Sequence, residues 1–159
     1  MSKNHTGRVA SLHLHPDKGG DPMRAVQEFE AVEQRGIRGN PRKFGVVSRT
    51  TGKQSKRQVS LIEREQIAEH AATLRLQTIP PGAVRANIET DGINLVALVG
   101  HEVRIGEAIL YLYEARTPCE KMDRICEGLR ALMEDGKQGV LAQVVRSGVI
   151  RVGDTVELV

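Results

Sequence analysis

A cysteine near the start of a helix is the residue of this chain whose setting most favours chemistry. It lies in the segment Arg116-Thr117-Pro118-Cys119-Glu120, where Thr117 suits a helix N-cap and Pro118 suits the first helical position. Glu120 completes a Thr-x-x-Glu capping box. Cys119 therefore falls at the second helical position, where unpaired backbone N–H groups and the helix dipole lower the pKa of a thiol. The pattern predicts a thiolate that attacks, carries sulfur or binds a soft metal, and leaves open a packed, unreactive thiol.

The second cysteine, Cys126, belongs to the apolar stripe of the same predicted helix. The helix is predicted over residues 117–134, and its buried face comprises Met122, Ile125, Cys126, Leu129, Leu132 and Met133. Cys126 is therefore interpreted as a core thiol. Seven helical residues separate the two cysteines by roughly 10 Å, which is too far for a disulfide.

A basic stretch without acidic residues is the second feature of functional interest. No Asp or Glu occurs from Gln34 to Ile62, while this stretch contains Arg35, Arg38, Arg42, Lys43, Arg49, Lys53, Lys56 and Arg57. Charge of one sign favours an anion, such as the phosphate of a small molecule or a nucleic-acid backbone. A solvated, flexible basic loop is the alternative.

The composition limits the class of protein. With 159 residues, 40% hydrophobic and 27% charged, the chain suits one globular domain, 1–159, with its core over about 8–158. Aromatic residues make up only 3%, which argues against a base-stacking surface for nucleic acid. Two cysteines do not make a disulfide framework, and the chain shows neither a membrane-spanning stretch nor an apolar signal core. We therefore expect a cytoplasmic protein that does not enter the membrane.

Short strands between glycine-containing turns must position these residues. Alternating or apolar runs predict strands over 8–15, 59–62, 84–88, 95–98, 102–105, 108–114 and 140–146, a pair within 149–158, and a short one at 45–48. Residues 25–34 fit either a strand or a short helix, and residues 63–74 have helical spacing, with Ile67, Ala68, Ala71 and Leu74 on one face. Many short strands of this kind favour a closed or nearly closed barrel, with the two helices outside or across it.

Two histidine motifs are interpreted as non-functional. His13 and His15 share one face of the first predicted strand, but no Cys, Asp or Glu cluster is spaced to complete a metal site, so a packed pair is favoured. The tripeptide that starts at His15 is similar to the His-Pro-Asp loop of J-domain co-chaperones. The few residues before it alternate like a strand and leave no room for the helices of that family, so the match is coincidental.

Four segments in order resemble one known family. They are Arg57–Glu65 (RQVSLIERE), Arg85–Ile88 (RANI), Arg116–Lys121 (RTPCEK) and Gly148–Asp154 (GVIRVGD). Together they resemble the MOSC domain, named for the C-terminal domain of molybdenum cofactor sulfurases, from about Val9 to the end of the chain. The resemblance implies an α+β, mainly β fold, a MOSC-like β-barrel with a few flanking helices, which agrees with the strand pattern.

The resemblance also implies a molybdenum-pterin cofactor. The family's cysteine at the position of Cys119 is proposed to ligate molybdenum or to carry sulfur, and some relatives reduce N-hydroxylated bases. Residues expected to hold the cofactor and its phosphate are Arg85 and Asn87, with Arg38, Arg42, Arg57, Arg116 and Thr117. A partner protein would supply sulfur, because no Lys-bearing motif of a desulfurase can be assigned. It would likewise supply electrons, because no Gly-rich dinucleotide loop followed by the expected acidic residue is found.

One loop departs from the family pattern. Many members have Gly-x-x-Gly-Asp-x-His where this chain has GIRGNPR over residues 36–42. Asn40 carries no charge and Arg42 is always cationic, so we do not expect a carboxylate and an imidazole from this loop. The same changes make the loop more favourable to anions. The alternative function is a non-catalytic module for an anion, a nucleotide or nucleic acid, with Cys119 structural.

Overall fold

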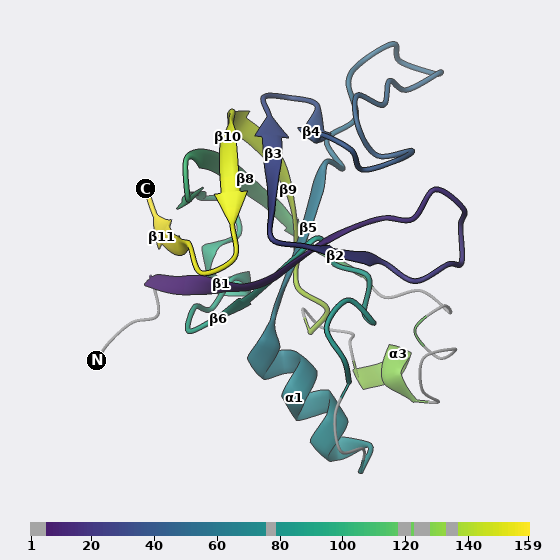
Figure 1. Ribbon diagram of the computed structural model, residues 1–159, viewed down its shortest axis with the longest axis vertical. Helices are drawn as coiled ribbons and strands as arrows, with labels where there is room; N and C mark the ends of the chain where they lie inside the picture. Colours follow the sequence, from purple (N-terminus) through teal and green to yellow (C-terminus); the bar gives the residue numbers. More distant parts are fainter. Residues whose placement is uncertain (1–5, 76–78, 118–121, 123–127, 133–136) are drawn as a thin grey trace.

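A closed ring of strands forms the body of the molecule (Figure 1). The computed structural model describes residues 6–75, 79–117, 122, 128–132 and 137–159. The ring runs in the order β1 (Thr6–Leu14), β11 (Thr155–Leu158), β7 (Glu102–Ile105), β8 (Ala108–Ala115), β9 (Val140–Arg146), β5 (Val59–Glu63) and β6 (Ile88–Asp91), which pairs with β1 again. Its neighbours are antiparallel except β5 and β6, which run parallel and are joined by helix α1 (Arg64–Thr73). The predicted mainly β barrel is confirmed.

A smaller sheet packs beside the barrel. It contains β10 (Gly148–Arg151), β3 (Glu28–Val32) and β4 (Gly36–Ile37), while β2 (Arg24–Val26) extends the large sheet along β1. The segment 25–34, which the sequence left between strand and helix, is therefore two strands. Phe29 and Ala31 are buried, while Glu28 and Glu30 are exposed, and this period-two alternation is what a strand with one covered face requires.

Aliphatic side chains fill the barrel. In β8, buried residues alternate with half-buried ones, so one face of the strand points into the ring. The largest fully buried side chains of this cluster are Leu12, Ile37, Leu61, Ile88, Leu95, Ile105, Leu110 and Leu112. Each such burial contributes about 1.5–3 kcal/mol relative to an exposed side chain. The barrel is therefore a firm frame for residues at its strand ends.

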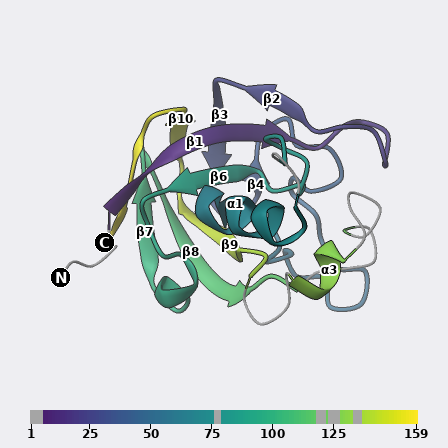
Figure 2. The same ribbon diagram turned by 90° about the horizontal axis from the view of Figure 1, so that it is seen from below.

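Helix α1 and the short helix α3 (Leu129–Leu132) lie below the barrel (Figure 1), and α1 crosses its lower end when viewed from below (Figure 2). Ile67 and Ala71 of α1 pack with Val84 and Met122 in a second apolar cluster. Ala68, predicted on the buried face, is exposed. Within the described residues, no helix is long and apolar enough to cross a membrane.

The start of β9 requires a glycine. Gly139 has φ of +82°, and a Cβ there would collide with the carbonyl oxygen of Leu61 and lie 2.8 Å from the Cα of Ile62. The missing side chain allows β9 to approach β5 closely. The carbonyl of Gly139 also accepts the backbone N–H of Arg116 at 3.0 Å, which holds the end of β8 in place.

Three strand predictions were wrong. The strand predicted over 84–88 begins only at Ile88, because Arg85 has φ of +64° and its N–H bonds the carbonyl of Gly82 at 3.0 Å. Residues 95–98 form the 3₁₀ helix η1 (Val96–Leu98), and the strand at 45–48 is reduced to one bridge between Val47 and Gln54. Most of the helix predicted over 117–134 lies outside the described residues.

Candidate functional site

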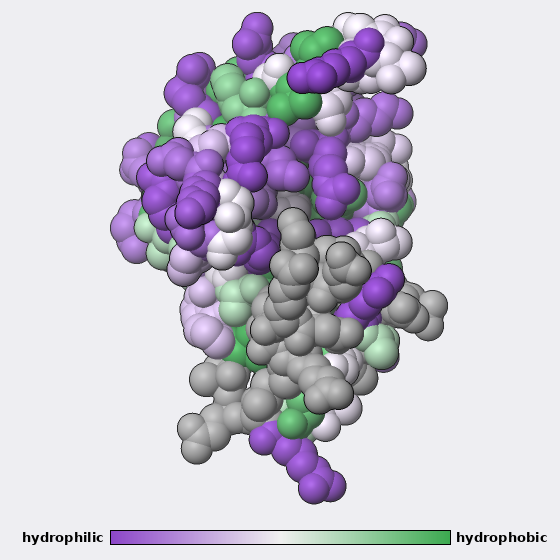
Figure 3. Space-filling model, turned by 90° about the vertical axis from the view of Figure 1, so that its right-hand side faces the viewer, coloured by the Kyte–Doolittle hydropathy of each residue, from purple (hydrophilic) through white to green (hydrophobic). Residues whose placement is uncertain are grey.

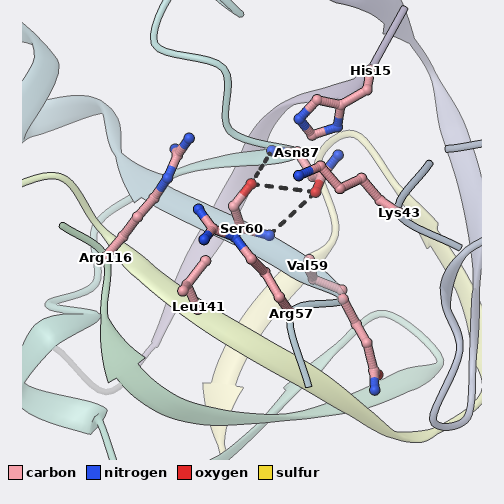
Figure 4. A pocket seen from close by; sticks show the side chains of 9 residues that line it. His15, Lys43, Arg57, Val59, Ser60, Asn87, Arg116 and Leu141 are labelled. Carbon is pink, nitrogen blue, oxygen red and sulfur yellow. Dashed lines mark hydrogen bonds between the residues drawn. The ribbon is translucent and has the colours of Figure 1, made fainter. Parts of the chain in front are cut away.

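Side chains from separate segments line a pocket that opens to solvent, with about 300 Å³ of empty space when the solvent at its mouth is included. Figure 4 shows them around a common hollow. Two of them belong to the first half of the chain outside β5: His15 follows β1, and Lys43 lies in the loop after β4. Four lie at β5, where Arg57 and Gln58 precede the strand and Val59 and Ser60 begin it. The others are Asn87 before β6, Arg116 after β8 and Leu141 in β9. None of these nine residues is acidic. Because the segments meet only through the barrel, the pocket is a product of the whole fold.

A buried amide and a hydroxyl form one wall of the pocket. Oδ1 of Asn87 accepts the N–H of Ser60 at 3.2 Å and its hydroxyl at 3.3 Å, while Nδ2 donates to the carbonyl of His13 at 3.0 Å. The backbone N–H of Asn87 donates to the hydroxyl of Ser60 at 3.1 Å (Figure 4). Asn87 is 2% exposed. These bonds join three segments, and among the described residues Nδ2 of Asn87, which carries two N–H groups, forms one hydrogen bond.

Cationic side chains surround this wall. Lys43, Arg57 and Arg116 reach the pocket from three directions (Figure 4). The backbone N–H of Arg116 is held by Gly139, and its Nη1 donates to the carbonyl of Val84 at 3.4 Å. A concave surface with charge of one sign concentrates the electrostatic potential. The pocket is therefore suited to an anion.

His15 is held by Asn40. Oδ1 of Asn40 accepts the backbone N–H of His15 at 2.8 Å and lies 2.9 Å from its Nδ1. The pKa of His15 is lowered to about 4, mainly by burial. The charges of Lys43, Arg85 and Arg116 contribute to this lowering, and the hydrogen bond with Asn40 opposes it. The imidazole is consequently uncharged near neutral pH.

The polar surface near the pocket continues the basic stretch. The loop residues Arg49, Lys53, Lys56 and Arg57 are exposed. The face of the molecule seen in Figure 3, the right-hand side of Figure 1, is largely hydrophilic above the grey residues. Part of the predicted basic run thus lines the pocket through Lys43 and Arg57, and the rest is solvated.

The comparison with known families decides the assignment. The family model described as MOSC domain matches residues 16–157. The chain belongs to the MOSC domain family. No curated protein sequence matches it significantly.

Solved structures share the fold of this MOSC domain. The YuaD protein from Bacillus subtilis has a TM-score of 0.80 at 20% identity, over 99% of this chain and 98% of that one. YiiM from Geobacillus stearothermophilus has a TM-score of 0.71 at 16% identity, over 96% of this chain and 75% of that one. YiiM from Escherichia coli has a TM-score of 0.67 at 22% identity, over 96% of this chain and 69% of that one. At such identities the likeness concerns the fold alone.

This MOSC domain brings several of the predicted residues together. Arg57, Asn87 and Arg116 line the pocket. Arg85 does not line it, and its Nη1 donates to the carbonyl of Asp21 at 3.0 Å, but its charge acts on His15.

Other predicted residues lie away from the pocket lining. Arg38 pairs with Glu30 at 2.8 Å and its guanidinium lies 5.5 Å from the ring centroid of Phe44. Arg42 donates to the carbonyl of Pro16 at 3.1 Å, and Thr117 is exposed. Cys119 and Cys126 lie outside the described residues.

The two histidines have separate packed environments. Nε2 of His13 lies 2.8 Å from the hydroxyl of Ser11 and 3.8 Å from Oε2 of Glu89, and His13 is 2% exposed. In the described part of the chain, no group of three or more His, Cys, Asp and Glu side chains is placed to hold a metal ion. Their environments agree with the packed interpretation, although His15 also faces the pocket.

Sequence reasoning missed part of the lining. Lys43 was visible in the acid-free run, and Gln58 and Ser60 lie inside the first segment that resembles the family. Gln58 is 3% exposed, and its amide bonds the carbonyl of Ser55 and the N–H of Val144, both at 2.8 Å. No local signal indicates that His15 meets Asn40.

Proposed function

We propose that this MOSC domain binds the molybdenum-pterin cofactor in the pocket and uses Cys119 as a ligand to molybdenum or as a carrier of sulfur. The observation that carries the proposal is the acid-free lining, in which Lys43, Arg57 and Arg116 surround the wall made by Asn87. Membership of the family suggests which anionic cofactor such a lining would serve.

The residues of the pocket fit an anionic group. A phosphate needs cations and N–H donors, and a guanidinium offers both in a planar fork. Arg57 and Arg116 supply guanidinium groups, Lys43 supplies an ammonium group, and Asn87 retains one amide N–H. His15 adds no charge to the pocket near neutral pH, so the attraction for an anion comes from Lys43, Arg57 and Arg116.

Covalent connectivity supports a role for Cys119 at this pocket. Cys119 follows Arg116 by three residues. Since a residue spans at most about 3.6 Å, the two Cα atoms lie within roughly 11 Å in any conformation. Arg116 itself is fixed by its bonds to Gly139 and Val84. This covalent limit, which holds for any conformation of the segment, agrees with the sulfur or metal role that the resemblance implies for Cys119.

In this proposal the chain binds and orients, and the cofactor supplies the redox chemistry of molybdenum. Arg57, Arg116 and Lys43 would hold the phosphate, and the wall at Ser60 and Asn87 would fix its depth. An oxidoreductase of this kind would receive electrons from a partner protein, whereas a sulfur carrier would receive sulfur from one. Either reaction suits a cytoplasmic location.

Metal and pterin analysis tests the proposal. The protein is purified from a molybdenum-sufficient host, and molybdenum and the fluorescent oxidation product of the pterin are measured per chain. We expect stoichiometric amounts in the wild type, loss of molybdenum in Cys119→Ala, and wild-type amounts in the matched control Cys126→Ala. Equal molybdenum in Cys119→Ala would contradict the ligand role.

Mass spectrometry and a salt series separate the remaining roles. A persulfide found on Cys119 in the absence of molybdenum would favour the sulfur carrier. Binding to nucleic acid that weakens steeply with salt, unchanged in Cys119→Ser, would favour the non-catalytic module instead.

A further inference from the structure

His15 brings an uncharged hydrogen-bond acceptor into a pocket lined by cations. The carbonyl oxygen of the Asn40 side chain accepts the backbone N–H of His15, a group that can only donate. The orientation of the Asn40 amide is thereby fixed. Nδ1 of His15, which lies 2.9 Å from the same oxygen, must then carry the imidazole proton. Nε2 is left as the acceptor.

The position of Nε2 makes this acceptor available to a ligand. His15 lines the pocket and its ring lies beside Lys43 and above Asn87 (Figure 4). In the part of the chain that the structure describes, no hydrogen bond to Nε2 is formed. The imidazole therefore offers a lone pair to whatever occupies the hollow.

Asn40 holds His15 although its own amide has a donor that is unpaired among the described residues, and this points to a functional reason. Asn40 is 1% exposed, and its Nδ2 has no hydrogen-bond partner within the described residues. A buried donor without a partner destabilises the folded protein. An aspartate would accept the same two bonds without an orphaned N–H, but its charge would favour a protonated imidazole. The amide keeps His15 neutral.

The charged groups that act on His15 support the same protonation state. Lys43, Arg85 and Arg116 each disfavour an imidazolium, and Arg57 lines the same pocket. Burial acts in the same direction and is the larger effect, lowering the pKa of His15 to about 4. The acceptor is thus maintained at neutral and mildly acidic pH.

We infer that the pocket selects a protonated oxyanion, one that carries both negative charge and an O–H donor, over an oxyanion with no proton. The cations attract either kind. Only the protonated kind, such as hydrogen phosphate, can donate to Nε2 of His15, whereas sulfate would place an oxygen lone pair against the nitrogen lone pair. The inference rests on the proposed function only in taking this pocket as an anion site, and it requires a phosphate monoester bound here to be in its monoprotonated form.

Inorganic phosphate and sulfate provide a charge-matched test. At about pH 8 phosphate is mainly the hydrogen phosphate dianion, so the two ligands differ in one O–H group. Isothermal titration of the full chain should show phosphate binding at least about tenfold more tightly than sulfate, the effect of one unpaired acceptor. Equal affinities would overturn the inference and leave the anion site intact. If the wild type binds neither ion, the inference and the anion site both fall, whatever the metal analysis shows.

Two variants and a control connect the selectivity to His15. His15→Ala should abolish the preference for phosphate, while His101→Ala, which removes an exposed imidazole, should keep it. Asn40→Asp should shift the preference toward sulfate, because a carboxylate at Nδ1 stabilises the imidazolium and turns Nε2 into a donor. A preference that survives in His15→Ala, or is unchanged in folded Asn40→Asp, would overturn the inference. If Asn40→Asp does not fold, His15→Ala decides.

Discussion

Replacing Asn87 by alanine is expected to lower the free energy of unfolding by about 3–5 kcal/mol, since orphaned buried groups cost about 1–3 kcal/mol each. The Asn87 amide accepts from Ser60 at 3.2 and 3.3 Å and donates to the carbonyl of His13 at 3.0 Å. Alanine removes all of these bonds and leaves the N–H of Ser60 and the carbonyl of His13 buried without the amide. The hydroxyl of Ser60 also loses its acceptor, which places the expected loss above that of a single bond.

Urea unfolding followed by far-UV circular dichroism measures this loss. With the slope m unchanged, the midpoint alone should fall, and the melting temperature should drop by roughly 6–20 °C in a chain of this size. Asn94→Ala is the matched control. Asn94 is exposed, and among the described residues its side chain accepts only the N–H of Ala97, at 3.2 Å, so the loss should stay below about 1 kcal/mol.

A loss for Asn87→Ala no larger than that for Asn94→Ala would refute the reasoning. It would mean that the amide does not join the three segments under native conditions. Asn87 would then be available to a ligand with its full set of donors and acceptors, and the pocket wall would need another explanation.

Two further predictions concern buried ionisable groups. The free energy of unfolding should decrease as pH falls from about 6.5 toward 4, because the unfolded chain binds a proton at His15 in that range and the folded protein does not. Urea titrations at several pH values measure this dependence. The free energy of unfolding of His15→Gln should vary less with pH than that of the wild type. Glu89, which is 0% exposed and accepts from Arg64 at 2.6 Å and from Gly82 at 2.7 Å, should cost about 3–5 kcal/mol when replaced by alanine. Thermal melts should show little change for the exposed control Glu107→Ala, and a small effect at Glu89 would contradict its structural role.

Strands with one covered face were predictable from the sequence. Residues 108–114 alternate between apolar and less apolar side chains, and the structure has β8 over Ala108–Ala115 with that alternation in burial. The same holds for 102–105, which became β7, whereas 140–146 became β9 with Val140, Leu141 and Ala142 all buried. The period-two burial of a strand that covers a core depends on consecutive residues, so the sequence of those residues predicts it.

Apolar runs that bury without joining a sheet were not predictable. Val84 and Ala86 are fully buried, but they pack in the cluster below the barrel, and the positive φ of Arg85 keeps their backbone out of β6. Residues 95–98 are equally apolar and form a 3₁₀ turn, in which the N–H of Ala97 donates to Oδ1 of Asn94. Short apolar runs fit a strand or a helical turn, and tertiary packing decides between them.

The candidate site divides in the same way. Arg57, Asn87 and Arg116 were expected at the site through the resemblance, and they do line one pocket. The pairing of His15 with Asn40 joins residues 25 positions apart and has no local signature. Arg38 was expected near an anion because of its charge, yet its partner Glu30 is set by the register of β3 and β4. The charge of a side chain predicts that it attracts an anion. The pairing of the strands decides whether that side chain lies at the pocket or forms an ion pair elsewhere.

The barrel, more than any loop, determines where Arg116 lies. Ala115 of β8 pairs with Val140, and the next residue, Arg116, bonds the carbonyl of Gly139. Gly139 lies against Leu61 of β5 so closely that a side chain would push the strands apart. The segment that carries Cys119 therefore leaves the barrel from a point fixed by the packing of three strands. Since Arg57 precedes β5, closure of the ring brings two guanidinium groups to one pocket and sets the start of the cysteine segment beside them.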